Sequence, residues 1–296
     1  MPKSDGSPSS NTPAAIQLYG ALAVGVLSVS SAAVLIRLAH APASAIAFWR
    51  LFLTSLLLLP VLKRPALSVT RQAWPMMALS GIFLAAHFIF WIHSLSLLPV
   101  ALSTALVSTH PLLIALFRRL QGHHPLPRGT QWGLVLLAAG LATLALGAGP
   151  HVSWLGIADA LAGSLFAGAY ILTGAYARRT LSATTYSWGT YTAASFILAL
   201  GLWGRQGNFG PMSWHLLLLY GLMAVIPTLG GHTLFNWMLR FVPASHVSLA
   251  MVGEIPGAAL LAWLVLHQLP TFAMWLSILL ITCGIAIALS TERMRS

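Results

Sequence analysis

Charged residues are scarce in this chain of 296 residues: Asp, Glu, Lys and Arg together make up 6% of it, and only four residues are acidic. A soluble domain carries about 25% charged residues, so this composition cannot cover a water-facing surface. Apolar residues make up 58% of the chain, and the mean hydropathy is +0.84. The sequence therefore predicts a membrane protein rather than a soluble enzyme.

Cysteine is nearly absent as well. Cys283 is the single cysteine, which excludes an intrachain disulfide and a metal site of the paired-cysteine type. The chain contains no phosphate loop, nucleophile elbow or HExxH motif. We therefore predict no catalytic residues, no cofactor and no metal. The net charge of +11 does not indicate a nucleic-acid partner, because the basic residues lie between apolar runs instead of forming a patch.

Apolar runs occupy most of the chain, and a helix needs about 20 apolar residues to cross a bilayer. The fold class predicted is an all-α membrane protein with ten transmembrane helices. The predicted spans are 17–38, 43–62, 74–96, 100–117, 131–148, 154–176, 185–204, 214–238, 244–266 and 271–290. Residues 1–16, rich in Ser, Pro and Asn, are expected to form a disordered cytoplasmic tail without a signal peptide, and 291–296 a second cytoplasmic tail.

Lys and Arg are distributed unequally between the two sets of connecting segments. With both termini on one side, twelve lie on that side, and only Arg37 and Arg205 lie on the other. The positive-inside rule then places the N- and C-termini in the cytoplasm. Tryptophans near predicted span ends are expected to be interfacial anchors: Trp74, Trp132, Trp154, Trp203, Trp214 and Trp275.

The two halves of the chain resemble each other at a shift of 145 residues. His87 then falls on His232, and Pro111 falls on Pro256. The repeat units are 17–148 and 154–290, each with five predicted helices. An odd number of helices inserts the second copy upside down, which predicts the inverted repeats common in secondary transporters, with a substrate site near the midplane.

Two residues that are normally charged lie near the middle of predicted spans. Glu254 is about ten residues into the ninth span, where a carboxylate is costly unless it is paired, protonated or facing water. It is a candidate for substrate binding or proton coupling, and the alternative is a structural hydrogen bond to a neighbouring helix. Arg50, midway in the second span, could pair with Glu254, contact a substrate carboxylate, or reach the interface.

Prolines and histidines supply further candidates. Pro111 and Pro256 each remove a backbone donor in mid-span, which either opens a binding site or only kinks the helix. His87, His232 and His110 could relay protons or make helix contacts. Trp91 and Asn236 could line a cavity, as could Trp49, Tyr170, Trp188, Tyr191 and Trp237. Asp159, near the outer end of the sixth span, is expected to be solvated.

Several stretches resemble the EamA family of the drug/metabolite transporter superfamily. They are AIAFWR (45–50), GIFLAAHFIFWIHSL (81–95), STALVSTHPLLIAL (103–116) and the segment 226–266, in which Glu254 stands close to Pro256 as is common in that family. The resemblance implies a ten-helix bundle in two inverted halves. It also implies export of small metabolites, often amino acids, across the bacterial inner membrane, proton-linked in some relatives and facilitative in others.

The leading hypothesis is a secondary transporter that exports amino acids or related compounds by alternating access. A cavity with only Arg50 and Glu254 as fixed charges fits a neutral or zwitterionic solute. The alternatives are efflux of multiple drugs or toxic compounds, an integral-membrane enzyme, and a channel. The expected partners are a small-molecule substrate and membrane lipid. Protons as the coupling ion, and a monomer against a homodimer, stay open.

Overall fold

The computed structural model describes residues 13–62, 73–122, 127–147, 153–204, 209–269 and 271–291. This part of the chain contains helices and their connections and no strand. Most of the two predicted tails, 1–12 and 292–296, lies outside the described residues. So do several of the cationic connections on which the predicted orientation rests, including 63–72.

The first half of the chain forms a run of helices. They are α1 (Ala15–Ser30), α2 (Ala32–Ala39), α3 (Ala43–Leu58) with the 3-10 turn η1 (Leu59–Val61), α5 (Ala73–Leu97), α6 (Val100–Val107), α7 (His110–Leu120) and α8 (Arg128–Gly147). Only Ser31 separates α1 from α2, so these two form one helical stretch.

The second half repeats this pattern. Its helices are α9 (Trp154–Ala177), α10 (Ala183–Trp203), α11 (Trp214–Met223), the π-helix η2 (Ala224–Thr233), α12 (Leu234–Met238), α13 (Ala244–Met251), α14 (Glu254–Leu266) and α15 (Phe272–Thr291). The elements α11, η2 and α12 follow one another without a gap and form one helical stretch.

Seven helical stretches of the described residues are long and apolar enough to cross a membrane. They are Ala15–Ala39, Ala43–Val61, Ala73–Leu97, Arg128–Gly147, Trp154–Ala177, Trp214–Met238 and Ala244–Leu266. The three other predicted spans coincide with helices: 100–117 with α6 and α7, 185–204 with α10, and 271–290 with α15. That these three also cross the membrane stays a prediction.

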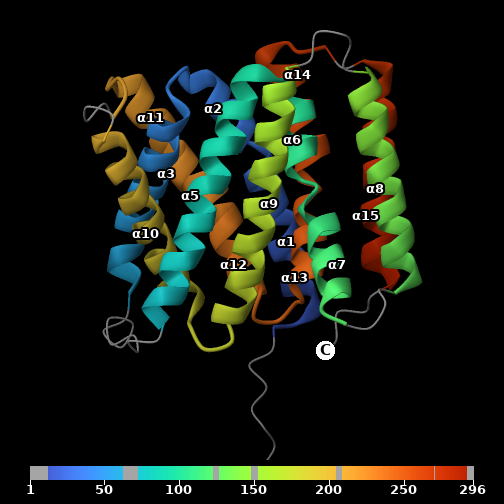
Figure 1. The fold of residues 1–296 in the computed structure, drawn as a ribbon, viewed down its shortest axis with the longest axis horizontal. Helices are drawn as coiled ribbons and strands as arrows, with labels where there is room; N and C mark the ends of the chain where they lie inside the picture. The colour runs from blue at the N-terminus through green and yellow to red at the C-terminus, as the bar shows by residue number, and fades with distance from the viewer. Residues whose placement is uncertain are drawn as a thin grey trace, which may run out of the picture.

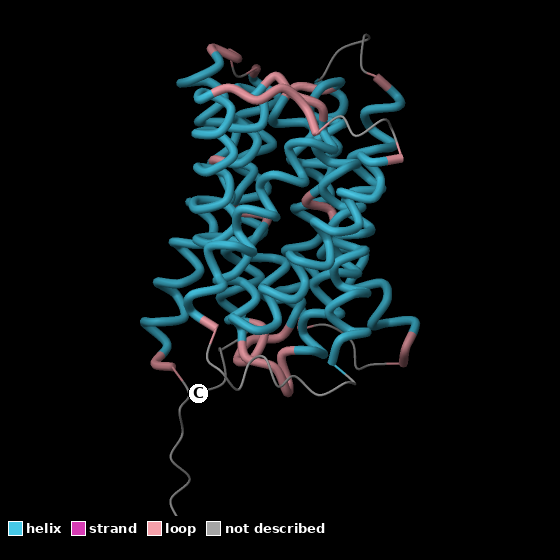
Figure 2. The backbone as a smooth tube through the Cα atoms, turned by 90° about the vertical axis from the view of Figure 1, so that its left-hand side faces the viewer, coloured by secondary structure: helices cyan, strands magenta, loops and turns pink. Residues whose placement is uncertain are grey.

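The helices stand side by side, with connections gathered at the two ends of the molecule (Figures 1 and 2). In Figure 1, α10 and α11 form one edge and the pair α8 and α15 forms the opposite edge. α1 begins at the lower end of Figure 1, whereas α9 ends there, so the first helices of the two halves run in opposite directions.

The outer surface carries large apolar side chains. Leu146, Trp214 and Trp154 are more than 80% exposed, which a water-facing surface would not favour but lipid accommodates. All six tryptophans predicted as interfacial anchors are between 45% and 87% exposed. Each lies within five residues of a helix end, where amphipathic rings sit at the membrane interface.

Two helices are broken at corresponding places in the two halves. α6 and α13 both have eight residues, both follow a proline with φ −55° and ψ 146°, and α13 begins 144 residues after α6. Each is followed by two non-helical residues, 108–109 and 252–253, before α7 and α14 begin. Short non-helical segments are visible at mid-height in Figure 2. Pro111 and Pro256, which were expected to disturb their spans, lie two and three residues after these breaks.

The position of each proline explains why the helix can restart there. Pro111 is the second residue of α7, and Pro256 is the third residue of α14. The first turn of a helix has no intrahelical partner for its N–H groups, so a proline there costs no hydrogen bond. The prolines thus begin new helical segments instead of bending continuous ones.

Close packing around the second break depends on a glycine. A Cβ at Gly257 would overlap the side chain of Ser30, so α14 and α1 approach each other too closely for a larger residue. Small residues permit such approach between membrane helices. This contact fixes the second broken helix against the first helix of the other half.

Candidate functional site

An enclosed cavity lies at the level of the two helix breaks. It is lined by Val29, Ala32, His87, Trp91, Val107, Ser108, His110, Ala167, Tyr170, Ile171, His232, Met251 and Glu254. Its free volume is about 20 Å³, enough for one water molecule. Five of the nine predicted site residues line it, namely Glu254, His87, His232, His110 and Trp91. They come from both halves of the chain.

Glu254 is the first residue of α14, directly after the break. Its side chain is 8% exposed, and among the described residues it has no hydrogen-bond or ion-pair partner. The positive end of the α14 dipole favours a carboxylate at this position. A buried carboxylate without a direct partner needs a proton, a water or a cationic ligand to offset its desolvation.

His110 is the first residue of α7, directly after the other break. Its Nδ1 lies 2.6 Å from the Ser248 hydroxyl of α13, so a hydrogen bond joins the two broken helices. α14 begins 144 residues after α7, one residue less than the shift that aligns Pro111 with Pro256. By helix bounds, His110 therefore corresponds to Glu254.

Aromatic rings form one wall of the cavity. His87 Nδ1 donates to the Gly163 carbonyl at 2.9 Å, because that oxygen can only accept. The His87 ring stacks on Trp91 with centroids 5.7 Å apart and lies 6.4 Å from His232. Trp91 Nε1 and His232 Nδ1 are buried and have no hydrogen-bond partner in the part of the chain that the structure describes. These two nitrogens are polar groups left for a solute or water to satisfy.

Arg50 lies behind this wall rather than on it. The side chain is fully buried in α3, and its guanidinium carbon lies 4.1 Å from the centroid of the Phe88 ring. Phe88 packs edge-on against His232 at 5.4 Å, so one aromatic layer separates Arg50 from the cavity. Arg50 interacts electrostatically with Glu254 but forms no ion pair with it in the described residues.

The π-helix η2 supplies the direct partner of Arg50. Nε and Nη2 of Arg50 donate to the Thr228 hydroxyl at 3.2 and 3.0 Å, while Nη1 has no partner. The Thr228 hydroxyl itself donates to the Met223 carbonyl at 2.7 Å. π-Helical turns often mark functional sites, and this one carries both Thr228 and His232.

Asn236 lies next to the cavity without lining it. Its Oδ1 accepts from the Tyr170 hydroxyl at 2.8 Å, and its Nδ2 donates to the Ser187 hydroxyl at 3.0 Å. Tyr170 is the only member of this network that reaches the cavity lining. Asn236 therefore orients Tyr170 and is itself fully occupied by protein groups.

Arg178 is hydrogen-bonded to the backbone of Asn236 and so belongs to the same hydrogen-bond network. Its Nε donates to the Asn236 carbonyl at 2.8 Å, and its other nitrogens donate to the carbonyls of Leu181 and Trp237. Burial, with a smaller effect of the Arg240 charge, lowers the pKa of Arg178 to about 10, which leaves it charged near neutral pH. This arginine was not a predicted site residue, because a cation after a span is expected from orientation alone.

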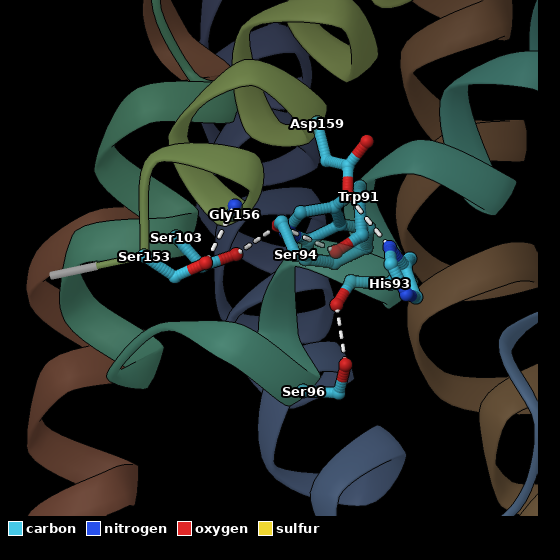
Figure 3. Close-up of polar contacts among 8 residues, drawn as sticks. All are labelled: Trp91, His93, Ser94, Ser96, Ser103, Ser153, Gly156 and Asp159. Carbon is cyan, nitrogen blue, oxygen red and sulfur yellow. Dashed lines mark hydrogen bonds and ion pairs between the residues drawn. The ribbon is translucent and has the colours of Figure 1, made fainter.

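A second polar cluster lies at the end of the molecule opposite to Arg178. His93 Nδ1 and Asp159 Oδ2 lie 2.6 Å apart and link α5 to α9 (Figure 3). Asp159 is 8% exposed, so the expectation that it is solvated is wrong. The expectation was based on the distance of Asp159 from the centre of its span, and this distance does not show whether a neighbouring helix supplies an ion-pair partner. Beside it, the Ser94 and Ser103 hydroxyls are 2.6 Å apart.

Some of the aromatic candidates line the central cavity, and the others pack elsewhere in the bundle. Tyr170 and Trp91 line the cavity, whereas Trp49 donates to the Phe209 carbonyl, and Trp188 and Trp237 pack on other aromatic rings. Pro111 and Pro256 shape the breaks and are not part of the lining. No group of three or more His, Cys, Asp or Glu in the described part of the chain could hold a metal ion.

Comparison with known proteins identifies the class of this fold and site as a membrane transporter. The EamA-like transporter family matches residues 16–146 and 154–290, and the chain belongs to this family, which is part of the drug/metabolite transporter superfamily. Its members are transporters and not enzymes. The chain is thus an integral, multi-pass membrane protein built from two copies of the family unit.

Similar proteins support the same class. The chain is 27% identical to the pseudopaline exporter CntI of Pseudomonas aeruginosa over 123 residues, which cover 42% of this chain and 43% of that protein. It is 24% identical to an uncharacterized transporter of Synechocystis sp. over 214 residues, which cover 70% and 64% of the two chains. The matches thus span about half of these relatives. A solved crystal structure superposes with a TM-score of 0.74 at 19% identity, covering 96% of this chain and all of the other, which supports the fold alone.

Proposed function

We propose that this protein is a secondary transporter that exports small zwitterionic metabolites, most of all amino acids or related compounds, by alternating access. The observation that carries the proposal is the Glu254 carboxylate in the lining of the central cavity, with the Arg50 cation buried behind one wall of that cavity. Glu254 presents a carboxylate with no direct partner, and Arg50 presents a cation with one unpartnered nitrogen. The two are separated by the aromatic layer of Phe88 and His232. The ammonium group of a zwitterionic solute complements Glu254 directly, and the buried Arg50 cation favours its carboxylate from behind the aromatic layer.

The fold proposed for this function has ten transmembrane helices in two inverted repeats, 17–148 and 154–290. The opposite directions of α1 and α9 support the inversion. The matching breaks in α6–α7 and α13–α14 place the starts of two half-helices at the cavity, an arrangement that transporters use for binding near the midplane. The small volume of the cavity corresponds to a closed state, from which either end opens when helices of the two halves move apart.

The proposed location is the bacterial inner membrane, with both termini in the cytoplasm. The lower end in Figure 1 is then cytoplasmic, because Arg128, Arg178, Arg179 and Arg240 lie in or beside helix ends there. Export follows from the resemblance to exporters, including the pseudopaline exporter. The aromatic and apolar lining, with Trp91, Tyr170 and Met251, favours one alternative, efflux of lipophilic compounds.

The experiment that tests the function is counterflow in proteoliposomes containing the purified full chain. Vesicles are loaded with one unlabelled amino acid at a time, and uptake of the same labelled solute is followed. Saturable exchange of one class of zwitterion supports the proposal. No exchange for any amino acid, together with exchange of lipophilic cations, would overturn it in favour of the efflux alternative.

A further inference from the structure

A second cavity lies at the upper end of Figure 1, apart from the central one. Its volume is about 500 Å³, within the range of sites for small organic ligands. It is lined by Arg37, Ser96, Leu97, Leu98, Pro99, Ala101, Leu102, Leu144, Gly147, Gln268, Leu269, Thr271 and Met274. None of these residues lines the central cavity. The site therefore needs an explanation of its own.

The cavity separates the α8–α15 pair from the rest of the bundle. Leu144 and Gly147 of α8 and Met274 of α15 form one wall, and the turn from α5 to α6 forms the facing wall. Figure 1 shows this pair standing at the edge of the molecule. The walls are mostly aliphatic, so the space suits an apolar chain and does not suit a fully polar solute.

Among the described residues that line the cavity, Arg37 is the single Lys or Arg. Its Nη2 donates to the Leu98 carbonyl at 3.1 Å, which orients the guanidinium. Its Nε is buried and has no partner. The Arg37 side chain is only partly buried and lines the cavity, and arginine forms strong, charge-assisted hydrogen bonds to phosphate oxygens.

The surroundings of the cavity indicate that its ligand comes from the membrane. Leu269 of the lining is 79% exposed, and Leu146 and Phe272, next to lining residues, are 87% and 82% exposed, so large apolar side chains flank the site. Arg37 lies in the last turn of the first membrane stretch, Ala15–Ala39. At the same end, Trp154 and Trp275 are exposed at the first turns of their helices, which is the level of lipid headgroups.

We propose that this cavity binds a phospholipid of the surrounding bilayer, with its phosphate on Arg37 and one acyl chain between the α8–α15 pair and α6. Charge complementarity at Arg37 and the aliphatic walls carry the inference together. The bound lipid fills the space between the pair and the bundle.

The test uses the purified full chain, stripped of lipid by excess detergent and titrated with phosphatidylglycerol in mixed micelles, with native mass spectrometry as the readout. Wild type should bind one lipid at low concentration. Arg37→Gln should raise the half-saturating lipid concentration about tenfold or more, because a hydrogen-bonded charge is lost. Arg128→Gln is the matched control, since Arg128 is an exposed arginine at the opposite end, and it should bind as wild type does.

A second variant retains Arg37 and fills part of the proposed lipid cavity with a larger side chain. Ser96 is an exposed residue of the lining, and Ser96→Trp should weaken lipid binding while Arg37 is retained. Equal lipid affinity in wild type, Arg37→Gln and Ser96→Trp would overturn the proposal. Competition by millimolar inorganic phosphate as effective as that by lipid would also overturn it, because the site would then bind a free anion.

Discussion

His110 and Glu254 occupy the same position in the two halves of the molecule: each is the first residue of the helical segment that follows a break, and each lines the central cavity. One is held by the Ser248 hydroxyl at 2.6 Å, and the other has no direct partner among the described residues. One half of the molecule thus presents a hydrogen-bonded histidine to the cavity, and the other half presents a carboxylate without a direct partner in the described part of the chain. This asymmetry makes Glu254 the natural site for an exchangeable proton or a cationic solute group.

The hydrogen bond between His110 and Ser248 should contribute to the stability of the closed state. Ser248→Ala leaves a buried imidazole nitrogen without its partner, which costs about 1–3 kcal/mol. We expect a lower midpoint of thermal unfolding in detergent, followed by intrinsic fluorescence. Ser96→Ala is the control, because it removes a hydroxyl that donates locally to the His93 carbonyl at an exposed site. Its free energy of unfolding should stay within about 0.5 kcal/mol of that of wild type, so its midpoint should hardly change. Equal midpoints for both variants would contradict the assignment.

Helix positions were predictable, because apolar runs of span length admit few other structures. The breaks were predictable from Pro111 and Pro256. The π-helix η2 and the hydrogen-bond partners Thr228 and Ser248 were not predictable. A polar residue in a span indicates that a hydrogen-bond partner is needed, but the sequence does not show which residue of another helix supplies it. Asp159 was misjudged for the same reason: its partner, His93, lies on another helix.

Arg50 should depend on Thr228 for its orientation. Thr228→Val keeps the shape of the side chain and removes the acceptor for Nε and Nη2 of Arg50. A buried charged donor then loses its partner, and we expect a loss of stability of about 1–3 kcal/mol together with weaker substrate binding in counterflow. Thr228→Ser retains the hydroxyl and should recover both properties. If the valine and serine variants behave alike, the hydroxyl has no such role.

Packing at the second break should be sensitive to a single methyl group. Gly257→Ala places a Cβ into the Ser30 side chain, and such overpacking costs about 1–3 kcal/mol. The control is Gly201→Ala in α10, where a Cβ meets nothing within 4 Å and alanine favours the helix. Unfolding midpoints of the two variants should move in opposite directions. A midpoint for Gly257→Ala at or above that of wild type would show that α1 can move away without cost.

The central claim is that Glu254 is the carboxylate through which transport responds to protons. The most direct measurement is efflux of the substrate found by counterflow, from proteoliposomes with and without an imposed pH gradient, in wild type, Glu254→Gln and Asp159→Asn. Asp159 is the matched control, since it is the other acidic residue in the described part of the chain, equally buried but paired with His93 outside the central cavity. The account predicts that the gradient accelerates efflux in wild type and Asp159→Asn, whereas Glu254→Gln needs a higher substrate concentration for counterflow and its efflux no longer responds to the gradient. An undiminished response in Glu254→Gln, or no response in wild type, would contradict it.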